Sequence, residues 1–477
     1  MGQKKQIVNV LADRYGSAEM TDLWSSESKV IFERELWVAV LETQAELGIP
    51  IPKNAIESYK EVVHDVDLES INRRERVTLH DVKARIEEFC ELAGHEHIHK
   101  GMTSRDLTEN VEQLQIRRSL LLVRSRVAAV LIKLGALAVE NAELVITGRS
   151  HNVPAQATTL GKRFANVGQE LLLAFERLDE LIGRYPLRGL KGPVGTQQDL
   201  LDLFDGDEQK VQLLEKAVAE KLDFNRTLVS VGQVYPRSLD LDVVSSLVQA
   251  GAAMGNLAMQ VRLMAGNDLV TEGFAAGQVG SSAMPHKMNT RSAERINGFV
   301  TILRGHLTMA AALAGDQWNE GDVSCSVVRR VMLPDAFFAI DGAIETTLTV
   351  LNGFGAYPQV IERELNRYLP FLATTKLLMA AIKAGAGREQ AHEIIKEHAV
   401  EAALALREGI GGENELLQKL IDDSRIPLDS DAVHAAIANR DTFVGRAYPQ
   451  VNEFAQQIQH LAERYPEAIS YTPDPIL

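Results

Sequence analysis

The sequence predicts an all-α protein built around a bundle of long helices, on three observations. Apolar residues recur at alternating three- and four-residue spacings over five long segments, the pattern of helices packed at shallow angles. Strand signals are scarce. One of the five segments is rich in alanine and glycine at 250–255, which permits close helix approach. So many long helices with small residues suggest a bundle that also packs against copies of itself.

The five segments follow one another through the middle of the chain. Their apolar stripes span 116–137, 164–182, 243–264, 296–314 and 333–351. Such a stripe builds a core and by itself says nothing about chemistry. The pattern shortens and becomes more polar on either side, with several glycine breaks after Pro370. We therefore predict three units, an N-terminal helical domain (1–111), a central bundle domain (112–365) and a C-terminal helical domain (366–477).

Composition limits the classes of function. A formal net charge of −15 over 477 residues argues against general nucleic-acid binding or a polybasic membrane contact. Two cysteines are too few for a disulfide framework and suit a reducing compartment. Residues 1–13 do not resemble a signal peptide, and no apolar run reaches membrane-spanning length. We expect a cytoplasmic protein with no nucleic-acid or membrane partner.

Five polar segments have compositions that a bundle core does not need. The segment GSSAMPHKMN at 280–289 combines hydroxyl, amide and cationic donors with Gly and Pro, which predicts a flexible loop that holds an anion. The pair RY at 14–15 lies in a polar turn, and HDV at 80–82 begins a helix. Two further polar loops are predicted, HKGMTSRD at 99–106 and RSHNVPAQATT at 149–159.

Three of the other four segments also have an ordinary structural explanation. The pair at 80–81 could be only a helix start. Thr103, Ser104 or Asp106 could be a simple N-cap, and His151 a loop histidine. From their spacing alone, Arg329 and Arg330 are expected at a solvated helix end.

The run HEHIH at 95–99 formally matches the zinc-protease pattern H-E-x-x-H. That motif needs a continuous helix, so that both histidines face one metal ion. Gly94 precedes the run and Gly101 follows it, and we expect the helix from Asp81 to Ala93 to end at Gly94. No obvious third ligand follows. We therefore predict a polar surface turn, in which His99 lies nearest the functional pocket.

Taken together, the polar segments resemble the adenylosuccinate lyase family of the fumarase/aspartase superfamily. The superfamily loop S-S-x-M-P-x-K-x-N is complete at 281–289, and R-Y, H-D-V, T-S-x-D and H-x-x-P-A-Q-x-T-T precede it in the family's order. Argininosuccinate lyases and fumarases usually carry an Asn in the T-S-x-D region, and this chain has none there. One departure is Thr290, where the family usually has Pro.

The resemblance implies a β-elimination that needs no metal and no organic cofactor. Fumarate would leave adenylosuccinate to give AMP, and succinylaminoimidazole carboxamide ribotide to give AICAR. Ser281 would be the base, and His151 the general acid, with His80 as the alternative. A serine is a poor base at its free pKa, so positive charge must activate it, and Lys287 is the evident candidate. Lys287 and Asn289 also suit the negative charge that develops on the substrate carboxylate.

The resemblance also implies the substrate contacts and the assembly. Ser326 and Arg330 are four residues apart and would share a helix face. The remaining contacts would come from Arg14, Tyr15 and Arg295 for the nucleotide, Thr103, Ser104 and Ser282 for carboxylates, and His80, Asp81, Gln233, Lys287 and Asn289. Each active site would be built from three subunits of a homotetramer with a twenty-helix core.

Two alternatives stay open at this stage. A 3-carboxymuconate cycloisomerase can carry a similar loop, but it acts on a tricarboxylate and would not need Arg14 and Tyr15 or a phosphate cluster. A relative that kept the bundle and lost catalysis, as some lens crystallins have, is the second. The intact Ser281, His151 and Lys287 argue against it.

Overall fold

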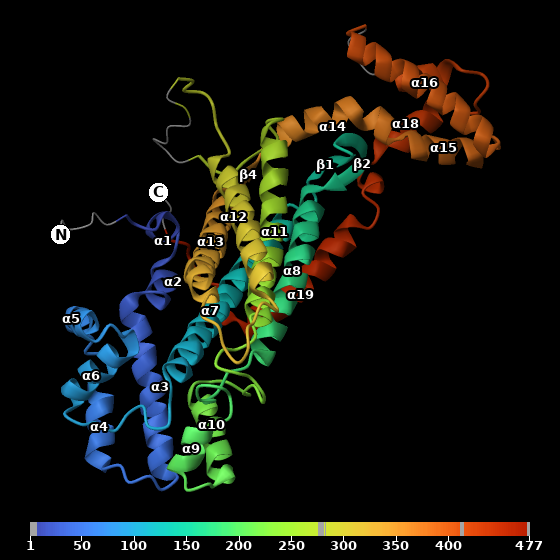
Figure 1. Ribbon diagram of the computed structural model, residues 1–477. Helices are drawn as coiled ribbons and strands as arrows, with labels where there is room; N and C mark the ends of the chain where they lie inside the picture. The colour runs from blue at the N-terminus through green and yellow to red at the C-terminus, as the bar shows by residue number, and fades with distance from the viewer. Residues whose placement is uncertain (1–6, 275–280, 282, 411–414, 475–477) are drawn as a thin grey trace.

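The chain folds around five long helices that lie side by side. The computed structural model describes residues 7–274, 281, 283–410 and 415–474. The five helices are α7 (Ser104–Glu140), α8 (Leu160–Arg184), α11 (Ser238–Ala265), α12 (Arg291–Leu313) and α13 (Cys325–Gly353), and they form an elongated bundle (Figure 1). Each helix contains one of the five predicted stripes, which confirms the prediction of an all-α bundle.

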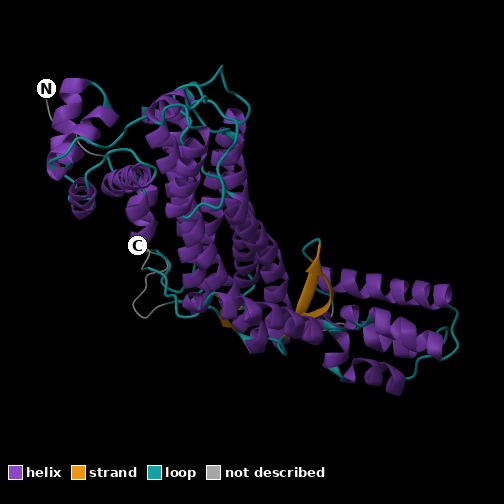
Figure 2. Cartoon of the chain, turned by 90° about the horizontal axis from the view of Figure 1, so that it is seen from below, coloured by secondary structure: helices purple, strands orange, loops and turns teal. Residues whose placement is uncertain are grey.

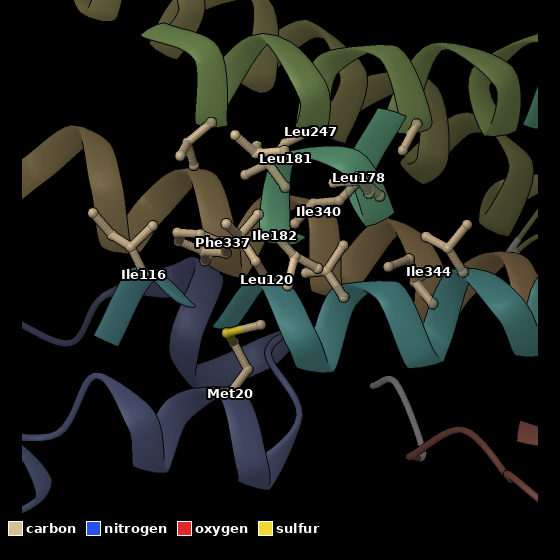
Figure 3. Close-up of a cluster of buried hydrophobic side chains, with 14 of the residues drawn as sticks. Met20, Ile116, Leu120, Leu178, Leu181, Ile182, Leu247, Phe337, Ile340 and Ile344 are labelled. Carbon is tan, nitrogen blue, oxygen red and sulfur yellow. The ribbon is translucent and has the colours of Figure 1, made fainter. Parts of the chain in front are cut away.

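The bundle core is formed where the apolar faces meet. Figure 3 shows side chains from α7, α8, α11 and α13 packed together with Met20, which comes from the short helix α2 (Ala18–Leu23). Glycines on α11 allow α12 to approach closely, since a Cβ atom on Gly251 would lie 2.9 Å from Leu303 Cδ1. The small residues of α11 are therefore already used inside the subunit.

The N-terminal helices pack along one side and one end of the bundle. They are α1 (Val10–Arg14), α2, α3 (Ser26–Glu46), α4 (Lys53–Glu61), α5 (Leu68–Thr78) and α6 (Asp81–Ala93). Helices α9 (Gln198–Leu203) and α10 (Glu208–Lys221) lie at the same end, with α10 against α3. Helix α6 ends at Gly94, which has a φ of +69°, as the sequence predicts.

A β-hairpin replaces the loop predicted at 149–159. Strand β1 (Val145–Ser150) pairs antiparallel with β2 (Val153–Thr159). His151 and Asn152 form its two-residue turn, and both have positive φ, 52° and 61°, as the turns that suit a twisted hairpin require. The prediction of a loop was wrong because the β-branched residues on both sides of the polar tip favour strands, and their preference outweighs the polar composition of the segment. The hairpin appears as the orange strands of Figure 2.

The C-terminal part contains a second, smaller core. Helices α15 (Thr374–Lys383), α16 (Arg388–Glu408), α17 (Leu416–Asp422) and α18 (Ser430–Ala438) enclose their own apolar cluster, beyond α14 (Pro358–Leu372). Helix α19 (Ala447–Arg464) then returns to pack on α7 and α8. The remaining elements are the pair β3 (Val270–Thr271) and β4 (Gly355–Ala356) and two short 3₁₀ turns. Among the helices described, none is both long and apolar enough to cross a membrane.

Candidate active site

Two predicted site residues, His80 and Ser104, meet where α6 and α7 begin. His80 is the N-cap of α6, and its Nδ1 accepts the backbone N–H of Lys83 at 3.2 Å. In the neutral ring the proton therefore lies on Nε2, which is 3.4 Å from Ser104 Oγ. The His80 side chain is exposed, so this donor can reach a ligand.

The neighbouring Asp81 is held as a carboxylate. Burial acts to raise its pKa, but Arg85 and the backbone N–H of Val82 outweigh burial, and the pKa of Asp81 is lowered. Arg85 Nη2 lies 3.7 Å from Asp81 Oδ2, and Arg85 also pairs with the buried Glu33 at 2.6 Å. The H-D-V segment thus presents a histidine donor and one fixed negative charge.

The T-S-x-D segment forms a capping box at the start of α7. Asp106 Oδ2 accepts the backbone N–H of Thr103 at 2.8 Å, while Thr103 Oγ1 accepts the N–H of Arg105 at 3.1 Å. Thr103 and Asp106 therefore have the capping role that their residue types allow. Ser104, the first residue of the helix, stays available for a ligand.

The fully buried Arg188 connects this helix start to the segment that carries Gln233. Arg188 Nη1 donates to Asp106 Oδ1 at 2.7 Å, and its Nη2 donates to the carbonyl of Gly232 at 3.0 Å. Gln233 in turn donates its backbone N–H to the carbonyl of Glu320 at 2.5 Å. Sequence reasoning missed Arg188, because its partners lie far away in the chain and no local pattern marks it.

The stretch that begins at Glu320 leads into α13, where Ser326 and Arg330 share a face as predicted. Arg329 is not at a solvated end but buried, with Nε 2.7 Å from Asp240 Oδ2 and Nη1 2.6 Å from Glu112 Oε2. Burial acts to raise the pKa of Glu112, but the Arg329 charge outweighs it and holds the pKa at about 2. The prediction failed for Arg329 because two carboxylates on other helices offset the cost of burying its charge.

A second group joins the start of the chain to the first turns of α12. The ring of Tyr15 packs edge-on against Phe299, with centroids 5.1 Å apart. The Arg295 guanidinium lies over the Tyr15 ring, 5.4 Å from its centroid. Arg14 is the last residue of α1, next to Tyr15. Two of the three predicted nucleotide contacts at 14, 15 and 295 are therefore in direct contact.

In the signature loop, Ser281 is half-buried and Lys287 is exposed. Ser281 Oγ accepts the backbone N–H groups of Met284 at 3.1 Å and Ala283 at 3.3 Å, which folds the loop into a turn. Asn289 is also half-buried. The predicted contact at 282 lies outside the described residues.

The exit of the loop leads directly into α12. Thr290 stands at the N-cap position, but its side chain makes no capping hydrogen bond. Glu272 supplies the cap instead, because its carboxylate accepts the N–H groups of Ser292 and Ala293, both at 2.9 Å. The residue that replaces the family's usual Pro is therefore not needed to start the helix.

These groups are separated within one chain. His151 is exposed at the hairpin tip. Figure 1 shows the hairpin and the start of α12 on opposite sides of α11 at one end of the bundle, with the start of α7 toward the other end. Within the described ranges, no hydrogen bond or ion pair joins His151 or Ser281 to the other or to the His80–Ser104 pair. One subunit alone therefore does not assemble the predicted acid, base and carboxylate contacts.

The H-E-x-x-H run does not have the geometry of a zinc-protease motif. Helix α6 ends at Ala93, before the first histidine, so the run is not helical. His99 lies inward, where its Nδ1 accepts the indole N–H of Trp37 at 3.1 Å. Burial lowers the pKa of His99, and Asp106 only partly opposes this effect. Over the part of the chain that the structure describes, no three or more His, Cys, Asp or Glu side chains are grouped to hold a metal ion.

Comparison with protein families gives two matches. The family model described as Lyase matches residues 11–305, and the model described as Adenylosuccinate lyase C-terminus matches residues 370–454. The first match alone covers more than half of the chain.

Individual proteins match over nearly the whole length. The chain is 34% identical to the adenylosuccinate lyase of Schistosoma mansoni over 460 residues, which cover 95% of each chain. It is 34% identical to that of Saccharomyces cerevisiae over 94% of this chain and 93% of the yeast one. It is 28% identical to that of Bacillus subtilis over 86% of this chain and 94% of the other.

Solved structures match the fold. The 3-carboxy-cis,cis-muconate lactonizing enzyme of Pseudomonas putida superposes with a TM-score of 0.81 at 20% identity, over 95% of this chain and 99% of that one. A fumarate lyase from Mesorhizobium gives a TM-score of 0.79 at 21% identity, over 93% and 98% of the two chains. At such identities the likeness establishes the shared fold alone.

Proposed function

The chain belongs to the adenylosuccinate lyase family and is a lyase, and we propose that it removes fumarate from adenylosuccinate to give AMP. We propose the same β-elimination for succinylaminoimidazole carboxamide ribotide, which gives AICAR. The observation that carries the proposal is the 34% identity to adenylosuccinate lyases over 95% of both chains. The family's C-terminal model at 370–454 supports the same assignment over a part of the chain that the general lyase model does not reach.

In the proposed mechanism, Ser281 removes the proton next to a succinyl carboxylate. Negative charge then develops on that carboxylate and needs donors held in place before the reaction. Lys287 and Asn289 supply them, and the positive charge of Lys287 also favours the serine oxyanion. The loop turn supports this role, because the two backbone N–H groups that donate hydrogen bonds to Ser281 Oγ would stabilise the alkoxide form of Ser281.

The leaving nitrogen needs a proton, and we propose that His151 donates it. Its exposure at the tip of a rigid hairpin suits a group that completes a site on another subunit. His80 is better suited to binding, because its Nε2–H is already directed at Ser104 and both can hold a substrate carboxylate. The Asp81 carboxylate lies beside this histidine, with Oδ1 3.8 Å from His80 Nδ1.

The remaining proposed contacts bind the nucleotide and the succinyl group. The phosphate and nucleoside meet Arg14, Tyr15, Arg295, Ser326, Arg330 and Gln233, and the carboxylates meet Thr103, Ser104 and Ser282. The aromatic and cationic contacts around Tyr15 and the exposure of Arg330 support these roles. The whole set combines cations and hydroxyls, as a phosphate and two carboxylates require.

We propose that the working form is a homotetramer with shared active sites, in the cytoplasm. The separation of Ser281, His151 and Ser104 within one chain supports the sharing. Large apolar side chains stand exposed along three bundle helices, which supports helix packing between copies: Leu173 on α8, Met259 and Leu263 on α11, and Ile302 and Met309 on α12. The free cysteines Cys90 and Cys325 suit a reducing compartment.

The first experiment mixes the purified protein with adenylosuccinate and follows the ultraviolet absorbance, with product identification. We expect AMP and fumarate in equal amounts, and no change on adding a chelator. An absence of turnover by a folded tetramer would contradict the proposal. Turnover of 3-carboxymuconate instead would assign the activity of the structural neighbour.

Replacement of Ser281 by Ala tests the base. We expect kcat to fall by about three orders of magnitude or more, with substrate binding nearly unchanged, because the side chain acts on the reacting proton. Ser324→Ala is the control, since it removes an exposed serine that has no proposed role. A Ser281→Ala enzyme with most of its turnover would exclude the serine as base.

Replacement of His151 and His80 by Ala, each alone, tests which histidine is the acid. Removing the general acid should lower kcat less for substrate analogues whose leaving group needs less protonation. We expect this dependence for His151→Ala, and a rise in KM without it for His80→Ala. The opposite pattern would exchange the two roles.

A further inference from the structure

A cavity of about 410 Å³ lies between the β1–β2 hairpin, α8 and α11. It is not among the proposed substrate contacts, and its lining includes no Asp or Glu. Its polar side chains are mainly cations and amides: Arg149, Arg163, Asn152, Asn166, Gln260 and Asn267. A cavity with this lining offers hydrogen-bond donors and positive charge but no negative charge of its own.

Arg163 supplies most of the uncompensated charge. It lies on the first turn of α8, is half-buried, and makes one long hydrogen bond, from Nη2 to the carbonyl of Thr147 at 3.4 Å. Within the described part of the chain, no carboxylate lies within ion-pairing distance of it. Burial lowers the pKa of Arg163, Arg149 adds to this effect, and Glu364 only partly opposes it. A half-buried guanidinium in this situation gains from a bound anion.

Arg149 is brought to the same cavity by an irregularity in the hairpin. The strand register shifts between Gly148 and Arg149, and a Cβ atom on Gly148 would lie 2.4 Å from the carbonyl oxygen of Gln156. The bulge therefore requires glycine, and bulges commonly redirect the next side chain. Arg149 pairs with Glu364 of α14 and donates to the carbonyl of Asn152 at 3.3 Å.

Lys162 is a third cation next to the cavity's lining, because it binds the lining residue Asn166. Its Nζ donates to Asn166 Oδ1 at 2.6 Å, which leaves the amide N–H₂ of Asn166 to donate elsewhere. Among the described residues, the three cations Arg149, Arg163 and Lys162 have one ion-pair partner, Glu364. Two positive charges remain.

We propose that this cavity binds a small oxyanion with two negative charges, such as phosphate or a dicarboxylate, between the guanidinium groups of Arg163 and Arg149. A planar guanidinium group can donate two parallel hydrogen bonds to two oxygens of a phosphate or of a carboxylate. Since Arg149 also holds the Asn152 carbonyl, next to His151, the bound anion ties the hairpin tip to α8. This site is separate from the proposed substrate contacts, and its test needs no turnover.

Hydrogen exchange of the hairpin amides at 147–158 tests the proposal on the full-length protein. We expect inorganic phosphate to slow their exchange several-fold, with fumarate compared as the dicarboxylate and sodium chloride at equal ionic strength as the control. The ligand that protects at the lower concentration identifies the source of the anion. Equal protection by chloride would overturn the proposal, because it would show charge screening alone.

Arg163→Gln should abolish this protection, and Arg163→Lys should weaken it, because lysine keeps the charge but loses the paired donors. Arg177→Gln is the matched control on the same helix, where its guanidinium binds Gln249 and Ser245 of α11 instead. We expect it to leave the protection intact. Protection that persists in Arg163→Gln would overturn the proposal. Arg330→Gln should weaken substrate binding without changing the protection of the hairpin amides. A failure of this proposal can therefore be distinguished from a failure of the proposed function.

Discussion

Buried charged residues fix the start of α7, where Ser104 is presented. Asp106 accepts four hydrogen bonds in the interior, from Arg188 and from three backbone N–H groups. Neither Asp106 nor Arg188 is exposed. A pair of this kind contributes less to stability than its contacts suggest, but the loss of one partner leaves an uncompensated buried charge.

Asp106→Asn should therefore destabilise the protein by about 3–5 kcal/mol, measured by urea unfolding. Asparagine keeps the shape of the side chain but leaves Arg188 without its counter-ion. Glu69→Gln is the control, because Glu69 forms only an exposed pair with Arg73 at 4.0 Å and should cost less than about 0.5 kcal/mol. A loss of unfolding free energy close to that of Glu69→Gln would show that Arg188 does not depend on the Asp106 carboxylate.

At the scale of elements, the C-terminal tail is held across α13 and α7 by one buried carboxylate. Glu345 Oε1 accepts the hydroxyl of Tyr471 at 2.7 Å, and its Oε2 accepts the N–H of Asp474 at 2.8 Å. Arg126 of α7 lies 2.6 Å away, and Asp341 is a second acid on the same helix. Burial raises the pKa of Glu345 to about 7, although Arg126 opposes the rise.

This pKa predicts a pH dependence of stability. An unfolded Glu titrates near pH ~4.3, so the folded protein binds more protons between that pH and about 7. The stabilising contribution is complete below pH ~4.3 and is lost as the pH rises through about 7. Thermal unfolding at pH 5 to 8 should show a fall that Glu345→Gln reduces. Glu112→Gln is the control, because its pKa of about 2 lies below this window. Equal slopes for Glu345→Gln and the parent protein would contradict the prediction.

At the scale of the whole molecule, the separation of Ser281 and His151 predicts complementation between subunits. Ser281→Ala and His151→Ala should each be inactive as pure tetramers. After equal amounts are unfolded together and refolded, random mixing should restore about a quarter of the sites. These sites take Ser281 from a His151→Ala copy and His151 from a Ser281→Ala copy. The control is each variant refolded alone. Recovery of no activity by mixed tetramers would place both residues in one subunit's site.

The apolar stripes were enough to predict the five bundle helices, because helical periodicity is a local property that neighbouring residues enforce. The start of α6 at Asp81 and its end at Gly94 could be predicted for the same reason, whereas the sequence left open which of Thr103, Ser104 and Asp106 caps α7. The hairpin at 145–159 could not be predicted, since the polar composition of this segment is typical of a loop and the strand pairing appears only in the structure.

The sequence by itself determined the fold class and the residue types of the candidate site, because both are carried by short-range patterns and by motif order. Only the tertiary structure decided that Arg188 joins α7 to the Gln233 segment, that Arg329 is buried, and that Arg163 faces a cavity without a counter-ion. These outcomes depend on which charges distant helices bring together. The free energy of a buried charge is set by those partners and not by its neighbours in the chain.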